Sequence, residues 1–329
     1  MLNIGEISEQ KKVNGRDFPL VVLPPNESVA ANPVSMLDWF ETNKSDIHSK
    51  LIEHGAVLLR GFPVESADRF EQLLDHSDYK NNPYIGGAAP RVQVTKSRVV
   101  TANEAPPSEK IPFHHEMAQT PKPPGYIFFY CDTPSKTGGA TSILHSNEIC
   151  QRFFELAPEF AKKIEEQGVR YIRYMPEVTD NASPIGRSWK ETFNVETREE
   201  CEELLREHNM SWSWEDAGVL KTETSTLPAI RLDKETEQKT FFNSIVAVYD
   251  GWNDSRNVST EAVVSGAGSL MDADVMEKTK QAMDELSVNF RWKKGDVLLV
   301  NNYTVLHARQ PFTGQRRILA SVAIKEQNE

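Results

Sequence analysis

The chain has 329 residues, of which 39% are hydrophobic and 26% charged, and its net charge is −11. This composition is typical of a globular protein and excludes a disordered one. The acidic balance disfavours nucleic acid and membrane surfaces as partners, because both are anionic and the sequence has no local basic patch. The three cysteines are far apart and odd in number, which argues against a secreted disulfide framework and a Cys-based metal site.

Hydropathy and linker signals suggest a simple organisation. No apolar run is long enough for a signal peptide or a membrane span, which favours a cytoplasmic protein. No Gly- or Ser-rich linker divides the chain, so we expect one domain over residues 1–329, with 1–90 as an N-terminal flank. A homo-oligomeric state is left open.

The N-terminal flank alternates helix and strand signals. Apolar residues at helical spacing predict a helix over 35–54, and a strand follows over 56–59. Ser66 is a suitable N-cap for a second helix that ends near His76. A loop is predicted over 81–90, where Pro, Gly and Asn dominate.

From residue 91 onward short strands alternate with turn signals, which predicts a β-rich core. The expected strands cover 92–94, 98–101, 113–117, 126–131, 169–174, 229–232, 240–243, 297–300 and 317–324. Helices are expected in an insertion over about 145–225, where Thr197 and Glu200 form a capping box, and again over 272–286. The pattern predicts a mainly β protein with flanking helices (α+β), built as a β-sandwich or barrel.

One strand carries a candidate metal-binding pair. Strand geometry places His114 and Glu116 on one face of the segment 111–117 and His115 on the other. An imidazole and a carboxylate in this arrangement can both reach one divalent metal, as a two-histidine, one-carboxylate site requires. Such His-x-acid pairs also occur by chance, so a polar pair near a sheet edge stays an alternative until a third ligand is found.

The third component lies near the C-terminal end. His307 ends an apolar run, and after a Pro/Gly turn Arg316 and Arg317 open the last strand. A guanidinium on a buried strand needs an anion to offset its desolvation, and a dicarboxylate is a suitable partner. The two arginines point to opposite faces, so we expect only one in the pocket; a surface ion pair is the alternative for either.

Six ordered segments share the motifs of one family. They are HGAVLLRGF at 54–62, PFHHEM at 112–117, GGAT at 138–141, FFN at 241–243, WKKGDV at 292–297, and the segment 307–317. By these motifs the chain resembles the taurine dioxygenase and clavaminate synthase-like family of iron(II)- and 2-oxoglutarate-dependent oxygenases. Glu116 stands where many relatives carry Asp, and in this the chain is similar to the clavaminate synthase-like branch.

The resemblance implies a double-stranded β-helix (jelly-roll, cupin-like) core over 91–329 with a helical insertion. It makes His114, Glu116 and His307 the ligands of Fe(II). The implied reaction uses O2 and couples oxidative decarboxylation of 2-oxoglutarate to hydroxylation, or a related oxidation, of a small-molecule substrate.

The resemblance also assigns residues around the metal. It places Thr141 and Arg317 on the distal carboxylate of 2-oxoglutarate. Arg91 and Asn103 precede the metal motif, and we regard them as candidate substrate contacts.

Three other functions were weighed against this one. A cupin-like metal dioxygenase that does not use 2-oxoglutarate would keep the metal ligands, but it would leave Thr141 and Arg317 without a role. A catalytically silent β-helix protein that binds a small molecule would not need three intact ligands. A zinc hydrolase is disfavoured because the sequence shows no independent nucleophile or general-base motif.

Overall fold

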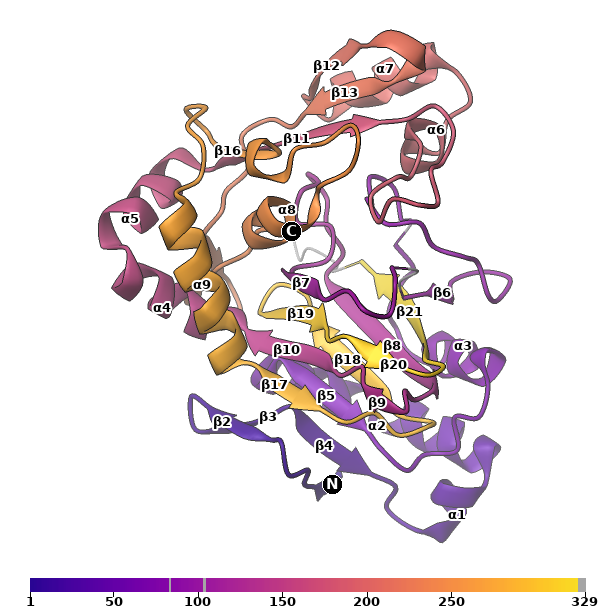
Figure 1. Ribbon diagram of the computed structural model, residues 1–329. Coiled ribbons are helices and arrows are strands. Elements are labelled where there is room, and N and C mark those ends of the chain that lie inside the picture. The colour runs from indigo at the N-terminus through magenta and orange to yellow at the C-terminus, as the bar shows by residue number, and fades with distance from the viewer. Residues whose placement is uncertain (83, 103–104, 325–329) are drawn as a thin grey trace.

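The computed structural model describes residues 1–82, 84–102 and 105–324. Helices and strands both contribute, so the protein is mixed α/β (Figure 1). The α-helices are α1 (Glu27–Ala31), α2 (Pro33–His54), α3 (Ala67–Asp75), α4 (Ser146–Leu156), α5 (Pro158–Gln167), α6 (Trp189–Phe193), α7 (Arg198–Glu207), α8 (Ile245–Gly251) and α9 (Ala273–Leu286). Among the described residues, none of these helices has the length and apolar character needed to cross a membrane.

The largest sheet has seven strands in the order β1-β4-β5-β18-β8-β21-β6. These strands are β1 (Asn3–Gly5), β4 (Leu20–Leu23), β5 (Ala56–Leu59), β18 (Val297–Asn301), β8 (Tyr126–Thr133), β21 (Arg317–Ala323) and β6 (Val100–Thr101). All neighbouring strands are antiparallel except β4 and β5, which run parallel. The N-terminal flank therefore contributes strands directly to this sheet.

A second sheet of four antiparallel strands carries the candidate metal ligands. Its order is β17-β10-β19-β7. The strands are β17 (Val288–Phe290), β10 (Thr141–His145), β19 (Val305–Arg309) and β7 (Ile111–His114). In the pairing of β19 with β7, His307 lies opposite His114.

The two sheets pack face to face across a shared apolar layer. In β8, Ile127 and Phe129 enter this layer, where they meet Ile143 of the second sheet. The alternate residues Phe128 and Tyr130 point to the other face and pack with side chains of α2 and α3. Because β8 is buried on both faces, its sequence is a continuous apolar run, as expected for a central strand.

Between β10 and β17 the chain builds a third sheet and most of the remaining helices. The sheet order is β12-β13-β11-β16, and it lies at the top of Figure 1, far from the N-terminal strands. Its strands are β12 (Ser211–Trp214), β13 (Leu220–Glu223), β11 (Val169–Met175) and β16 (Val263–Ser265). The insertion was predicted over 145–225 and as helical, yet β16 lies beyond that boundary and the inserted segment contains a sheet.

Short elements complete the chain. They are the strand pairs β2 (Lys11–Val13) with β3 (Arg16–Phe18), β9 (Thr137–Gly138) with β20 (Phe312–Thr313), and β14 (Arg231–Asp233) with β15 (Gln238–Thr240), and the 3-10 turns Asp216–Gly218 and Ser259–Glu261.

Several local predictions are confirmed. Strand β5 has the predicted bounds, and Ser66 accepts a hydrogen bond from the amide of Arg69 as the N-cap of α3. Thr197 and Glu200 form the predicted capping box at the start of α7. The strand predicted over 92–94 is wrong, since only Gln93 in this segment pairs, through an isolated bridge to Val100.

A buried ion pair joins the end of β5 to the start of β18. Arg60 donates through Nε to Oδ1 of Asp296 at 3.0 Å and through Nη2 to Oδ2 at 2.6 Å. The Asp296 side chain is only 1% exposed, and Oδ2 also accepts the amide of Lys293. The Asp296 carboxylate therefore holds both the Arg60 guanidinium and the backbone of the turn before β18.

We expect Asp296→Ala to lower the free energy of unfolding by about 3–5 kcal/mol, because it leaves a largely buried guanidinium without its carboxylate. The control is Glu166→Ala, which removes an exposed partner 4.0 Å from Lys162 and should change stability by less than about 1 kcal/mol. Urea unfolding followed by circular dichroism measures both. If both substitutions changed the free energy of unfolding equally, the buried ion pair would contribute no more to stability than the exposed one.

Candidate metal centre and co-substrate pocket

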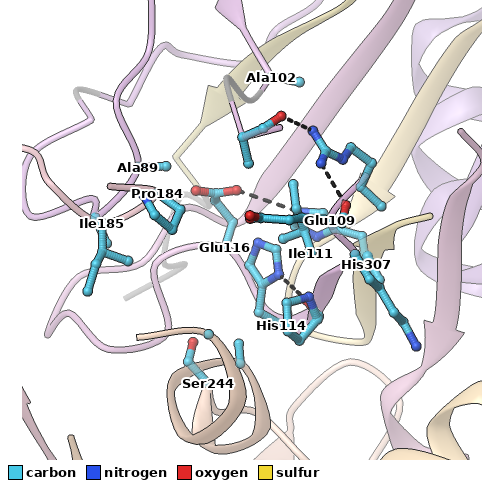
Figure 2. A pocket seen from close by; sticks show the side chains of 18 of the residues that line it. Ala89, Ala102, Glu109, Ile111, His114, Glu116, Pro184, Ile185, Ser244 and His307 are labelled. Carbon is cyan, nitrogen blue, oxygen red and sulfur yellow. Dashed lines mark hydrogen bonds and ion pairs between the residues drawn. The ribbon is translucent and has the colours of Figure 1, made fainter. Parts of the chain in front are cut away.

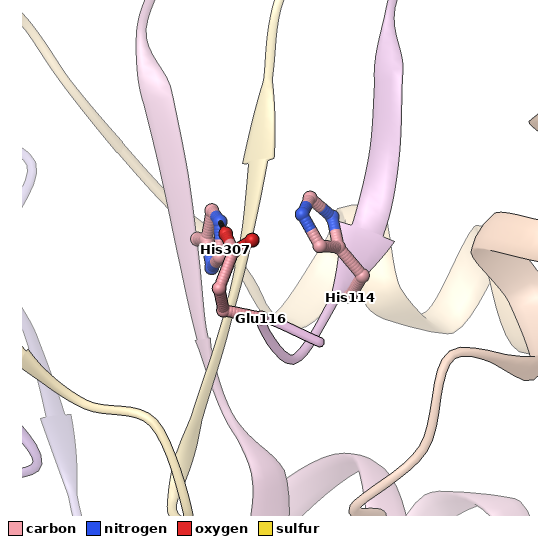
Figure 3. Close-up of side chains that lie close together, drawn as sticks. All are labelled: His114, Glu116 and His307. Atoms are coloured by element: carbon pink, nitrogen blue, oxygen red, sulfur yellow. Dashed lines mark ion pairs between the residues drawn. The ribbon is translucent and has the colours of Figure 1, made fainter. Parts of the chain in front are cut away.

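Three side chains from two segments far apart in sequence converge at one end of the second sheet. One possible ligand atom each from His114, Glu116 and His307 can be chosen so that all lie within 4.8 Å of one another. Figure 3 shows the two imidazoles on neighbouring strands, with the Glu116 carboxylate next to His307. The structure thus brings together the three residues that strand parity and the C-terminal motif had singled out.

The surroundings of His114 prepare one ring nitrogen for a metal. Its Nδ1 lies 2.9 Å from the carbonyl oxygen of Pro112, which can only accept a hydrogen bond. Nδ1 therefore carries the proton and Nε2 keeps a free lone pair. Burial lowers the pKa of His114 to about 4, and the neighbouring His307 adds to this effect. The imidazole is consequently neutral near pH 7, which is the form that binds metals.

The carboxylate of Glu116 has two differently engaged oxygens. Oε1 accepts a hydrogen bond from Nη2 of Arg91 at 2.8 Å, whereas Oε2 lies 3.6 Å from Nε2 of His307. Burial alone would raise the pKa of this carboxyl group, but Arg91 and His307 outweigh burial and hold the pKa well below its usual range. Glu116 is therefore ionised, and Oε2 is the oxygen that remains for a metal.

Asn302 holds the backbone of Glu116 in place beyond the end of β7. Its Oδ1 accepts the amide of Glu116 at 2.8 Å, and its Nδ2 donates to the Glu116 carbonyl at 3.0 Å. Nδ2 also donates to the carbonyl of Pro124 at 2.7 Å, and the side chain is fully buried. The sequence analysis missed Asn302. Its position directly after β18 is the only feature that could have suggested it.

His115 is excluded as a ligand by its own hydrogen bonds. Its Nδ1 donates to the carbonyl of Asn302, and its Nε2 lies 2.9 Å from Oγ of Ser146. The ring is fully buried, and burial lowers its pKa to about 3. His115 thus points away from the other ligands, as expected, but the strand predicted over 113–117 is wrong: β7 ends at His114, and the turn after it, not strand alternation, places Glu116.

A cation and a hydroxyl form the other end of the pocket. Arg316 donates through Nη2 to Oγ1 of Thr141 at 3.3 Å and through Nε to the carbonyl of Gly139 at 2.8 Å. Burial lowers the pKa of Arg316 to about 10, and the nearby Arg309 adds to the effect, so the guanidinium is still charged near pH 7. No carboxylate pairs with it among the described residues, which leaves this cation available to an anion.

The expectation that Arg317 faces the pocket is wrong. Its Nη1 donates to Oδ2 of Asp132 at 3.1 Å, its side chain is 48% exposed, and it is not among the residues that line the pocket. The prediction that only one arginine of the pair enters the pocket holds, but that arginine is Arg316. Arg317 has the surface ion pair that was weighed as the alternative.

There is a physical reason why the sequence pointed to Arg317 and not to Arg316. Strand β21 is buried on both faces: Ile318 and Ala320 face the layer between the sheets, whereas Leu319 packs against the helical layer. Its sequence therefore shows no polar and apolar alternation from which a facing could be read. The pairing of β21 with β8 also shifts register between Arg317 and Ile318.

One cavity connects the metal ligands with Arg316. Thr141, Phe129 and Ile318 line it between the two ends. The remaining wall includes Tyr84, Ala88, Ala89, Arg91, Ala102, Met117, Gln119, Pro184, Ile185, Ser244, Ala247, Val248 and Trp252. Figure 2 shows the triad with Ala89, Pro184, Ile185 and Ser244 around it. Asn103, a candidate substrate contact, lies outside the described residues.

The donor set fits a divalent metal of the iron type. Two imidazoles and one carboxylate form the two-histidine, one-carboxylate arrangement, which leaves coordination positions open for other ligands. Nδ1 of His307 is buried without a hydrogen-bond partner among the described residues. The rings of His114 and His307 lie 4.3 Å apart between centroids, and Glu116 lies beside His307, so the possible ligand atoms already face one another.

Comparisons with known proteins agree with this geometry. Residues 22–323 match the family model described as taurine catabolism dioxygenase TauD, TfdA family. A clavaminate synthase-like protein of Arabidopsis thaliana is 42% identical over 319 residues, which cover 96% of each chain. A match of this length includes the N-terminal flank as well as both sheets.

Two solved structures share the fold at low sequence identity. A Burkholderia xenovorans protein assigned as an α-ketoglutarate-dependent taurine dioxygenase aligns with a TM-score of 0.54 at 12% identity, covering 99% of this chain and 93% of that one. The protein AAD-2, crystallised with Mn(II) and N-oxalylglycine, aligns with a TM-score of 0.52 at 10% identity, covering 99% and 98%. With a family model that spans nearly the whole chain and a relative at 42% identity, the protein belongs to the TauD, TfdA family of dioxygenases.

Proposed function

We propose that this protein oxidises a small-molecule substrate at the centre formed by His114, Glu116 and His307, with 2-oxoglutarate held by Arg316 and Thr141. As a member of its family it is an iron(II)- and 2-oxoglutarate-dependent oxygenase, and hence an oxidoreductase. The observation that carries the proposal is one cavity with a largely buried metal-ligand triad at one end and, at the other, a part-buried guanidinium that pairs with no carboxylate among the described residues.

The chain's own groups divide the work at the metal end. His114 would bind through Nε2 and Glu116 through Oε2, the atoms that their other hydrogen bonds leave free. When bound, Fe(II) supplies the activation of O2 and of the 2-oxo acid that drives substrate oxidation. The protein contributes ligand orientation, a partly enclosed cavity and a fixed charge balance.

Arg91 takes a different role from the one first suggested. It lines the cavity, but its guanidinium pairs with Glu116 and stacks 4.0 Å from the centroid of the Tyr84 ring. We propose that it orients the carboxylate ligand and balances its charge, in place of a direct substrate contact. Asn103 remains a candidate substrate contact.

The wall near the metal favours a substrate that presents carbon and hydrogen. Ala89, Pro184, Ile185, Ala247 and Val248 line it and carry no charge, although Glu109, Lys110 and Arg309 also line the cavity. The cavity holds about 200 Å³, which limits its contents to small molecules. Hydroxylation or a related oxidation of a C–H bond suits such a surface.

We also propose that the seven-stranded and four-stranded sheets form the double-stranded β-helix expected from the family motifs. The support is that antiparallel strands distant in sequence alternate in both sheets and enclose one apolar layer. Two further expectations stay predictions: a single domain over 1–329 and a cytoplasmic location. The oligomeric state stays open.

Two alternatives make different demands on the cavity. A metal dioxygenase without 2-oxoglutarate, or a silent small-molecule-binding protein, would not need Arg316 in the cavity beside Thr141. Release of succinate from 2-oxoglutarate, measured with iron(II), O2 and a panel of small molecules, separates the proposed oxygenase from both. Absence of succinate under every condition, at full metal occupancy, would favour one of the alternatives.

We expect the wild-type protein with iron(II) and 2-oxoglutarate, under anaerobic conditions, to show the visible charge-transfer band of a chelated 2-oxo acid. His307→Ala should lose the band, because it removes one of three ligands. The matched control is His76→Ala. His76 stands two residues before Asp78, so it has a similar His-x-acid spacing, but it does not line the cavity, and its loss should leave the band intact. A full-intensity band in His307→Ala would mean that the ligand was misidentified.

Arg316→Met should weaken 2-oxoglutarate binding by roughly 10- to 100-fold, because a charge-assisted hydrogen bond to the distal carboxylate is lost. Arg317→Met serves as the control and should change binding by less than about twofold, since it removes only a half-exposed ion pair. Titration of the visible band gives both dissociation constants. The reverse order of effects would restore Arg317 as the co-substrate ligand.

A further inference from the structure

Trp292 contacts the co-substrate end of the cavity through a single polar atom. It follows β17, is 5% exposed, and packs edge-on against Phe290 with ring centroids 4.8 Å apart. Its indole Nε1 donates to Oγ1 of Thr141 at 3.0 Å. From the sequence, a tryptophan at this position suggests ordinary core packing. In the structure, however, its only hydrogen-bond donor, the indole N–H, binds the hydroxyl proposed to contact 2-oxoglutarate.

The hydrogen bonds at Thr141 determine where its hydroxyl hydrogen can go. A threonine hydroxyl accepts two hydrogen bonds and donates one. Indole and guanidinium nitrogens only donate, so Trp292 and Arg316 occupy both acceptor positions of Oγ1. Within the described ranges the hydroxyl hydrogen has no protein acceptor, and Thr141 lines the cavity.

We propose that Trp292 is a positioning residue for the co-substrate: its N–H fixes the Thr141 hydroxyl as a donor toward the distal carboxylate of 2-oxoglutarate. The inference rests on the proposed function and deepens it. Without the indole donor, an Oγ1 lone pair is free and the hydroxyl can rotate to donate elsewhere. With it, Thr141 and Arg316 present two donors to the same anion before the anion arrives, which lowers the ordering cost of binding.

The decisive variant is Trp292→Phe, which keeps an aromatic ring in the layer and removes the N–H. We expect its dissociation constant for 2-oxoglutarate, from anaerobic titration of the visible band, to rise roughly 3- to 12-fold. The dissociation constant for Mn(II), measured without co-substrate, should stay within about twofold, because Trp292 contacts Thr141 and Phe290 and, among the described residues, no member of the triad.

Two further measurements separate positioning from packing. Binding of 2-oxopentanoate, which lacks the distal carboxylate, should be the same in wild type and Trp292→Phe. In a Thr141→Val background, Trp292→Phe should cause no further loss of 2-oxoglutarate affinity, because the hydroxyl that it orients is already absent. If Trp292→Phe does not fold, benzothienylalanine at position 292 keeps the shape of tryptophan and replaces only the N–H by sulfur.

The outcomes are distinct. Selective weakening of 2-oxoglutarate that disappears in the Thr141→Val background supports the proposal. Equal weakening of both 2-oxo acids, an additive loss with Thr141→Val, or an unchanged affinity would overturn it. A wild-type protein that binds Mn(II) but shows no band with iron(II) and 2-oxoglutarate would instead refute the proposed function itself.

Discussion

The register between β7 and β19 determines the position of the metal centre. His114 and His307 are directly paired, so both imidazoles leave the sheet on the same face. Glu116 follows beyond the strand end, where Asn302 holds its backbone and Met117 adopts a positive φ of 55°. A slip of one residue in β19 would replace His307 by an apolar neighbour, Leu306 or Ala308, and no loop adjustment could restore the triad.

Charge balance explains why this centre can be buried. Glu116 is 4% exposed, and its negative charge is matched by Arg91. Arg316 is a second, part-buried cation, and in the proposed function it would bind the distal carboxylate of the co-substrate. The other carboxylate of a 2-oxo acid would meet the metal. Each anion that the reaction requires therefore has its own cation in the cavity, which offsets the cost of removing it from water.

Some residues of this site could be predicted from the sequence, and others could not. Strand alternation selected His114 over His115, although β7 ends at His114 and a turn, not a continued strand, brings Glu116 to the metal site. The same rule could not choose between Arg316 and Arg317, since β21 is apolar on both faces. Asn302 and Trp292 act across separations of 186 and 151 residues, and short local patterns carry no signal for such contacts.

The strands that place the metal also set the length of the co-substrate. In the pairing of β10 with β19, Ile143 lies opposite His307 and Thr141 opposite Arg309, so Thr141 is two residues from the level of the metal ligand. Two residues of a strand span about 7 Å. A 2-oxo acid chelated at one end reaches this level only if a short carbon chain separates its keto group from a second carboxylate. The two methylenes of 2-oxoglutarate supply that chain, so the register of rigid strands, and no mobile loop, favours this co-substrate over shorter dicarboxylates.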